Sequence, residues 1–234
     1  MSLTQGAAAL ILMTLKSVNS NPTRQRRKQA RPQELLEAGL ALFVEKGFAA
    51  TKSEEVAALA GVSKGTLYLY YPSKEELFKA VVRESLSARI AEGEALFANH
   101  HGSMADLLTL VMNEWWRRVG QGKAGGISKI MLAEARHFPD LALFYVDEVV
   151  LPTHQLLGRL IERGIESGEF RPVPVAETVH VLIGPMLYMM LSEHSFSVCK
   201  TQLPVIDPLV VLAVQLDLIL RGLLAAPQTT KTTD

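Results

Sequence analysis

The sequence predicts an all-helical protein, and two observations carry this prediction. Apolar residues recur three and four positions apart through most of the 234-residue chain, which is the spacing of amphipathic helices. No convincing run of alternating apolar and polar residues, and no Asn-Gly pair favouring a β-hairpin, stands in the sequence. Because 48% of the residues are hydrophobic, the chain can bury a core in one large domain or two small ones.

Sequence signals bound the first two expected helices. The first begins near Pro32, because proline is favoured in the first helical turn, and Gly47 ends it. Thr51 and Glu54 have the spacing of a capping box, in which the hydroxyl accepts from a backbone amide and the carboxylate reaches back. A second helix is therefore expected to begin there and to end at Gly61.

The later helices follow the same signals. A third, short helix is expected over 63–70, where Pro72 ends it. Ser73 and Glu76 form another capping box, which opens a long helix toward residue 97. Glycine and proline then separate further helices, expected at 103–119, 127–137, 139–167, 175–195 and 207–224.

A helix-turn-helix is predicted within this pattern. Two steeply crossing helices need a small residue at their contact, a residue able to turn left-handed between them, and an apolar residue that locks the second onto the first. Ala57, Gly61 and Leu67 meet these needs at spacings of four and six residues. An ordinary helical hairpin is the alternative interpretation if only the spacing of these three residues is considered.

Charge separates two regions of the chain. The formal net charge is zero, so a nucleic-acid partner must meet a local basic patch. Residues 21–91 hold 12 Lys/Arg and 8 Asp/Glu, whereas residues 92–234 hold 11 and 16. This asymmetry indicates two regions with different partners.

Cysteine usage and hydropathy favour a cytoplasmic protein without a membrane partner. The single cysteine, Cys199, excludes an intrachain disulfide and fits a reducing compartment. Residues 7–15 resemble the apolar part of a signal peptide, but no basic residue precedes them, so we expect a helical or disordered extension. Later apolar runs, around 182–191 and from Leu203, are too short or too interrupted by charge for a membrane span.

The stretch from Phe43 to Phe78, FVEKGFAATKSEEVAALAGVSKGTLYLYYPSKEELF, resembles the DNA-binding domain of the TetR family. Hallmarks of that family are the Gly-Phe pair, the threonine that follows it, the G-V-S-K-G-T-L-Y turn and helix, and the Y-x-x-K-E-x-L-F exit. The resemblance implies a dimeric transcriptional regulator that binds operator DNA and releases it when a small-molecule effector binds.

The chemistry of these residues supports DNA contact independently. Glycine permits a close backbone approach at the start of the third helix, and a neighbouring lysine can reach a phosphate or a guanine edge. Hydroxyl and amine groups at the starts of the second and fourth helices can donate to phosphate oxygens, aided by the helix dipole. By this chemistry the expected DNA contacts are Lys52, Ser53, Lys64, Gly65, Thr66, Tyr68, Tyr70 and Lys74. The resemblance implies the same positions from Lys64 to Lys74 and adds Leu69.

Two nearby features keep more than one interpretation. The side chain of Tyr71, beside Pro72, is expected to pack into the core more readily than to touch DNA. A basic leader precedes the domain and is either an arm that enters a minor groove or a solvated, disordered segment. It consists of Arg24, Arg26, Arg27, Lys28 and Arg31.

A homodimer is expected, because one short recognition helix makes too few contacts for operator affinity. The last two helices are apolar on more than one face, so they are expected to pair with a second copy as a four-helix bundle. The expected domains are 1–27 as a flexible extension, 28–78 for DNA binding, 79–226 for ligand binding and dimerisation, and 227–234 as a tail.

The segment EARHFPDLALFYVDEVVLPTHQLLGRLIERGIESGEFRPV resembles the C-terminal domain of AcrR-like members of the family, which bind effectors among their middle helices. Methionine and aromatic side chains suit hydrophobic ligands, although each of them could instead be plain core. The expected cavity residues are Met112, Trp115, Trp116, Met131, Phe138, Phe144, Tyr145, His154 and Tyr188.

Two other classes of function are compatible with parts of the sequence. Glu134 with His137, and Glu177 with His180, are Glu-x-x-His pairs of the kind that hold a di-metal centre in ferritin-like enzymes. That site also needs two more inward-facing glutamates, so we expect no enzyme, no catalytic residue, no metal and no cofactor. An architectural DNA-binding protein without an effector is the other alternative.

Overall fold

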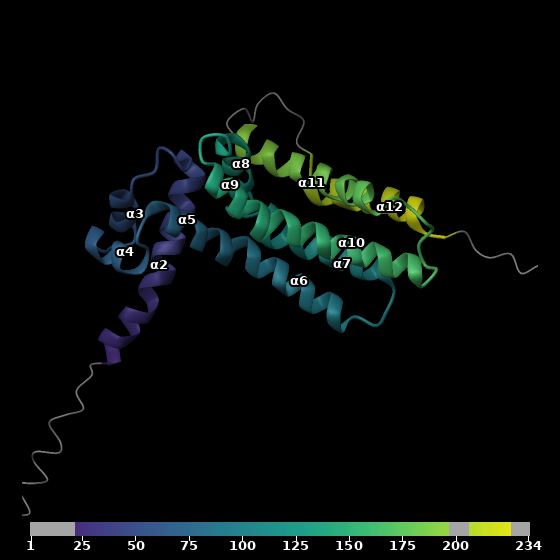
Figure 1. Cartoon of the computed structure of the whole chain (residues 1–234), viewed down its shortest axis with the longest axis horizontal. Coiled ribbons are helices and arrows are strands. Elements are labelled where there is room, and N and C mark those ends of the chain that lie inside the picture. The colour runs from purple at the N-terminus through teal and green to yellow at the C-terminus, as the bar shows by residue number, and fades with distance from the viewer. Residues whose placement is uncertain (1–21, 197–205, 226–234) are drawn as a thin grey trace, which may run out of the picture.

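The computed structural model describes residues 22–196 and 206–225, and over these ranges it contains helices and no strand. A small N-terminal unit sits at one end of a longer helical bundle (Figure 1). In this unit α2 spans Pro22–Lys46, α3 spans Ser53–Leu59 and α4 spans Lys64–Tyr70. The all-helical class predicted from sequence is confirmed.

The start of α2 corrects the sequence prediction. The helix begins at Pro22 instead of near Pro32, which lies inside it. Residues 23–31 are rich in arginine, glutamine and lysine, which form helices well, so the internal proline does not end the helix. Helix α2 therefore includes residues 22–27 of the expected extension, and the basic leader has a helical backbone. Residues 1–21, with the apolar stretch 7–15, lie outside the described part.

The cap of α3 is also corrected. Thr51 is buried, and its hydroxyl donates to the carbonyls of Leu42 at 3.1 Å and Gly47 at 2.7 Å. It therefore closes the end of α2 and does not begin α3. The N-cap is Lys52, whose backbone amide is 3.4 Å from the carboxylate of Glu55. The expected box of Thr51 with Glu54 is thus displaced by one residue.

The other N-terminal boundaries agree with the sequence. Gly47 and Gly61 take the left-handed φ values of 84° and 66° that end α2 and turn the chain after α3. Ser63 accepts from the Thr66 amide at 3.1 Å, and Ser73 accepts from the Glu76 amide at 3.2 Å. These bonds cap α4 and the helix that follows it.

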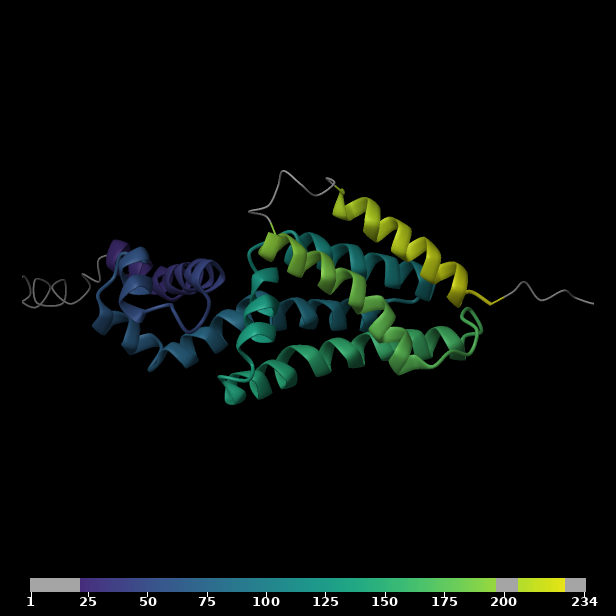
Figure 2. The ribbon, with the colours of Figure 1, turned by 90° about the horizontal axis from the view of Figure 1, so that it is seen from above.

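One long helix joins the two parts of the molecule. It consists of α5 (Lys74–Val82), a π-helical turn η1 (Arg83–Ser87) and α6 (Ala88–Asn99), and is called the connecting helix below. The rest of the bundle comprises α7 (Met104–Trp115), η2 (Trp116–Gly120), α8 (Gly125–Glu134), α9 (Pro139–Tyr145), η3 (Val146–Val150), α10 (Leu151–Glu166), α11 (Val175–Phe196) and α12 (Pro208–Leu223). Figures 1 and 2 show α11 and α12 along one side of this bundle.

The core is continuous from the N-terminal unit into the bundle. Phe43, Phe48 and Phe78 form an aromatic cluster with ring centroids 5.1–5.7 Å apart. The Phe138 ring from the bundle contacts Phe48 edge-on at 4.8 Å. Such aromatic contacts add to the burial of apolar area, so they fix the small unit against the larger one.

Candidate functional site

The three residues of the predicted helix-turn-helix occupy the positions that the motif requires. The side chains of Ala57 and Leu67 are buried, and Gly61 has positive φ. The Val62 amide donates to the Ala57 carbonyl at 2.9 Å, which closes the turn. The steep pairing of α3 with α4 is therefore built as the spacing predicts.

α4 exposes a surface at the outer end of the small unit (Figure 1). Leu69 is 85% exposed and Tyr68 39% exposed, while Leu67 on the opposite side of the helix is fully buried. A Cβ added at Gly65 would meet only the Ser63 Oγ, at 3.8 Å. The fold therefore leaves open space at Gly65, into which another molecule can approach.

An ion pair joins α3 to α4 on this surface. The Lys64 ammonium hydrogen-bonds the Glu54 carboxylate, and both side chains are more than half exposed. The hydrogen bond lowers the pKa of Glu54 and raises the pKa of Lys64, so both groups are charged near neutral pH. A phosphate or base edge that binds Lys64 must compete with Glu54.

Two of the expected DNA contacts are revised. Ser53 is only 6% exposed, which leaves little of it open to contact with DNA, whereas Lys52 is exposed. The Lys74 ammonium donates to the carbonyls of Phe48 at 2.8 Å, Thr51 at 3.0 Å and Ala49 at 3.2 Å. An ammonium has three N–H donors, so these bonds occupy all of them. Lys74 therefore holds the loop 47–51 and has no donor left for phosphate.

Glu134, at the end of α8, holds the same loop from the other side. Its carboxylate accepts from the backbone amides of Phe48 at 2.8 Å and Ala49 at 2.9 Å. A Cβ added at Gly47 would approach the Glu134 Oε1 to 2.7 Å, so this contact requires glycine there. The loop 47–51 is thus bonded to both the connecting helix and α8.

The bundle encloses a cavity of about 1040 Å³, lined by residues of α6, α7, η2, α8, α9, η3, α10 and α11. This volume is slightly above the ~300–1,000 Å³ that is usual for small-molecule sites. Ile90 and Gly93 of the connecting helix, Leu157 of α10 and Met186 of α11 are among its apolar wall residues. The cavity therefore has room for a bulky, largely apolar molecule.

The structure brings four of the nine expected cavity residues into this wall, namely Met112, Trp115, Tyr145 and His154. The other five lie elsewhere. Trp116 and Met131 are buried in the core, and Phe138 packs on Phe48. Phe144 stacks under the Arg83 guanidinium at 4.8 Å, and Tyr188 is 70% exposed on α11. Sequence periodicity placed these residues on helices but did not distinguish their faces.

Polar side chains of the wall have altered acidity. The Tyr145 hydroxyl lies 2.9 Å from Ser128 Oγ, and burial raises its pKa. Burial also lowers the pKa of His154, and the neighbouring His180, whose ring centroid is 4.9 Å away, adds to the shift. Near neutral pH His154 is therefore uncharged and can accept or donate a hydrogen bond.

The residues of the alternative di-metal site are used differently. The Glu134 carboxylate binds backbone amides, and the His180 Nδ1 lies 2.8 Å from the Ala176 carbonyl. Among the described residues no group of three or more His, Cys, Asp or Glu is placed to hold a metal ion.

α11 and α12 expose an apolar face. By length and composition alone, α11 could cross a membrane. This corrects the expectation that every apolar run is too short or too interrupted by charge for a membrane span. It packs against α8, α10 and α12, as a helix of a bundle does. The large apolar side chains left exposed on the two helices include Val181, Tyr188, Leu209, Val210, Val214 and Leu218. An exposed face of this kind indicates a protein partner.

Comparison with known proteins gives matches along both parts of the chain. Residues 35–81 match the family described as bacterial regulatory proteins, tetR family, and residues 98–198 match the family described as tetracyclin repressor-like, C-terminal domain. The uncharacterized HTH-type transcriptional regulator YfiR of Bacillus subtilis is 27% identical over 65% of this chain and 74% of its own length. The HTH-type transcriptional regulator RutR of Escherichia coli is 42% identical over 34% of this chain, and the match spans 37% of RutR.

A solved structure shares the fold. The transcriptional regulator FadR from Bacillus subtilis, in complex with stearoyl-CoA, superposes with a TM-score of 0.63 at 18% identity, covering 81% of this chain and 98% of that one.

Proposed function

Because this chain belongs to the TetR family of bacterial regulatory proteins, we propose that it represses transcription from an operator until a bulky, largely apolar small molecule fills its cavity. It is a DNA-binding regulator and not an enzyme. The relative FadR was solved with stearoyl-CoA, which supports a sizeable effector for this fold.

The ligand-dependent part of this proposal rests on one observation: the helices that form the cavity wall also hold the DNA-binding unit. The connecting helix contributes Ile90 to the wall and Lys74 to the loop 47–51. α8 contributes Leu132 to the wall and Glu134 to the same loop. A ligand that displaces these helices therefore displaces α3 and α4. Coupling of this kind typically amounts to ~1–3 kcal/mol, or about 5- to 150-fold in affinity.

DNA contact is assigned to the exposed surface of α3 and α4. Basic and hydroxyl side chains there neutralise or hydrogen-bond phosphates, and those at the start of α4 reach base edges in the major groove. The proposed contacts are Lys52, Lys64, Gly65, Thr66, Tyr68, Leu69 and Tyr70. Ser53 and Lys74 are left out because the structure buries the first and engages the amine of the second.

A homodimer presents two such surfaces. Helices α11 and α12 lie far from α4 (Figure 1), so pairing through their exposed apolar residues leaves both recognition helices free. Two half-sites would then lie about one helical turn, ~34 Å, or a multiple apart. We place residues 28–78 in the DNA-binding domain and 79–226 in the ligand-binding and dimerisation domain, in a cytoplasmic protein.

The DNA-binding proposal is tested by fluorescence anisotropy with duplex DNA from upstream of the protein's own coding region. The wild-type chain is expected to bind this duplex in a salt-sensitive manner and above the level of a scrambled duplex. Tyr68→Ala or Lys64→Ala is expected to abolish the preference while light scattering still reports a dimer. Unchanged binding by both variants would refute the assignment of α4.

A further inference from the structure

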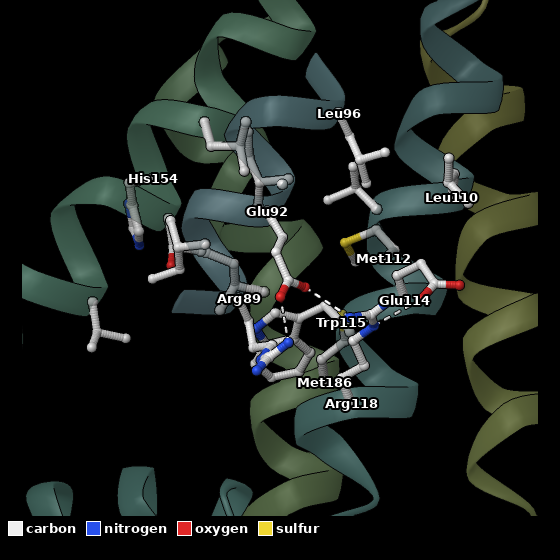
Figure 3. A pocket seen from close by; sticks show the side chains of 18 of the residues that line it. Arg89, Glu92, Leu96, Leu110, Met112, Glu114, Trp115, Arg118, His154 and Met186 are labelled. Carbon is white, nitrogen blue, oxygen red and sulfur yellow. Dashed lines mark hydrogen bonds and ion pairs between the residues drawn. The ribbon is translucent and has the colours of Figure 1, made fainter. Parts of the chain in front are cut away.

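The charged groups of the cavity wall gather at one place. Arg89 and Glu92 come from α6, Glu114 from α7, and Arg117 and Arg118 from η2. These five side chains are called the rim cluster. They are the arginine and glutamate residues of the cavity lining, and they bring three positive and two negative charges. Figure 3 shows Arg89, Glu92 and Arg118 meeting beside Trp115, with His154 on the other side of the view.

The three arginines share two carboxylates. Glu92 binds Arg89 and, at 2.8 Å, the Nη1 of Arg118. Glu114 binds Arg117 Nη2 at 2.7 Å and Arg118 Nε at 3.0 Å. Each guanidinium has about five N–H donors, so the cluster holds more donors than two carboxylates can satisfy. It also keeps an excess positive charge.

The rim cluster is accessible to solvent, and so are the apolar lining residues Leu96, Leu110 and Leu132, which are 39%, 42% and 60% exposed. The deeper wall is buried. The Arg117 and Arg118 side chains are 66% and 50% exposed, but Met112 is 3% and Leu157 is 4% exposed. The charged groups therefore lie at a mouth that they share with exposed leucines, and buried apolar surface lies behind it. This is the arrangement that receives a molecule with one charged end.

Local backbone geometry places the arginines at the mouth. Arg117 and Arg118 lie in the π-helical turn η2, and Arg89 follows the turn η1 closely. A third such turn, η3, contributes Val149 and Val150 to the wall. π-helical turns inside helices occur frequently at functional sites, because they change which side chains face a given direction.

We propose that the ligand of this cavity is an amphipathic anion. Its apolar body occupies the interior of about 1040 Å³, and its carboxylate or phosphate binds Arg89, Arg117 and Arg118. The anion binds donors that Glu92 and Glu114 leave unused and bridges α6 to η2. This proposal rests on the proposed function, since it names the class of the effector.

The proposal is tested with three probes of equal chain length: hexadecanoate, hexadecanol and hexadecyltrimethylammonium, each below its micelle concentration. Trp115 lines the cavity and is one of two tryptophans, so its emission reports binding in the full chain. Hexadecanoate is expected to bind about 10-fold or more tightly than hexadecanol, because charge-assisted hydrogen bonds exceed neutral ones. The ammonium probe is expected to bind weakest.

Variants of the rim cluster separate charge recognition from apolar binding. Arg117→Gln combined with Arg118→Gln is expected to remove the preference for hexadecanoate and leave hexadecanol affinity unchanged. Glu114→Gln is expected to strengthen hexadecanoate binding, because it removes a competing acceptor. Arg159→Gln serves as the matched control, since Arg159 forms an ion pair with Glu94 outside the cavity wall.

Three results would overturn the amphipathic anion: equal affinity for hexadecanol, a preference that survives the double arginine substitution, or no binding of any probe. Each of them leaves operator binding measurable by anisotropy. A failure of the proposed function would appear separately, as a wild-type chain with no preference for any duplex.

Discussion

Some polar side chains of the DNA-binding unit hydrogen-bond within the protein and hold its fold, and others are exposed and can contact another molecule. Two lysines of similar predicted role show the difference. The Lys74 ammonium is saturated by carbonyls of the loop 47–51, whereas the Lys64 ammonium pairs with the exposed Glu54 and lies 5.8 Å from the ring centroid of Tyr68. A side chain that the fold does not need is the better candidate for contact with DNA.

Gly65→Ala tests this distinction. Because the added Cβ meets only Ser63 Oγ at 3.8 Å and alanine forms helices better than glycine, the melting temperature by circular dichroism should stay equal or rise. Operator affinity, measured by anisotropy, should fall about 10-fold or more. The added methyl group would occupy the space through which the backbone of α4 comes close to DNA.

Gly61→Ala is the matched control. Its φ of 66° makes any Cβ strained, so stability should drop by about 1–2 kcal/mol. If Gly65→Ala destabilised the chain as much and left operator affinity intact, the glycine would be structural and the assignment wrong.

Glu54→Gln tests competition for Lys64. The pair is exposed, so stability should change by less than about 1 kcal/mol. Operator affinity should rise, because a carboxylate that repels phosphate and occupies the Lys64 amine is gone. Glu75→Gln, an exposed substitution at the start of α5, provides a comparison. Weaker operator binding by Glu54→Gln would contradict the role given to Lys64.

Stability should fall in mild acid through two partly buried histidines. The pKa values of His154 and His194 are lowered, mainly by burial, below the ordinary value of 6.5. The unfolded chain then takes up protons more readily, so stability is full above pH 6.5 and declines as pH falls toward the folded-state pKa values. Thermal melts from about pH 8 to about pH 5 should show this decline, with a smaller decline in His154→Gln. An identical pH dependence in the variant would argue against it.

The sequence predicted residues whose partners are close along the chain and missed those whose partners are distant. Ser63, Ser73 and the Ala57–Gly61–Leu67 spacing follow local rules of capping and turning, and the structure confirms them. Lys74 is bonded to carbonyls more than twenty residues away. No local pattern carries that information.

At the scale of helices, boundaries were predicted better than faces. Each helix after α4 lies close to its expected range, because glycine, proline and capping residues act locally. The start of α2 was missed because a favourable composition overrides one internal proline. Five of the nine residues expected to line the cavity lie elsewhere. In a helix without a clear polar side, the sequence does not indicate which apolar residues face the cavity and which face the core.

Glu134→Gln tests the link between α8 and the loop 47–51. The amide keeps the shape but accepts more weakly from the Phe48 and Ala49 amides than a carboxylate does. Ligand-free operator binding should be largely kept, while the weakening of operator binding by ligand should shrink about 5-fold or more. Anisotropy titrations with and without ligand measure both quantities.

Glu162→Gln on α10 is the control, because that exposed carboxylate makes no contact with the loop. Full ligand response in Glu134→Gln would show that α8 does not transmit occupancy and would leave the connecting helix as the route.

At the scale of the whole molecule, the exposed apolar face of α11 and α12 is explained if it packs against the same face of a second chain in a homodimer. Val214→Asp places a charge on this face, where Val214 is 53% exposed in the single chain. It should convert the dimer to a monomer in light scattering and remove operator binding, because one half-site contact is too weak. Leu143→Asp, a similar change at a 63% exposed position of α9, should keep the dimer. A Val214→Asp dimer would move the interface elsewhere.

The central claim is that filling the cavity and holding the operator oppose each other. The most direct test takes the small molecule that native mass spectrometry finds bound, or that raises the melting temperature in a screen, and measures operator affinity across its concentration. Operator affinity should fall about 5- to 150-fold, and saturating operator should weaken ligand binding by the same factor. A ligand that saturates the cavity while operator affinity stays constant would contradict the account.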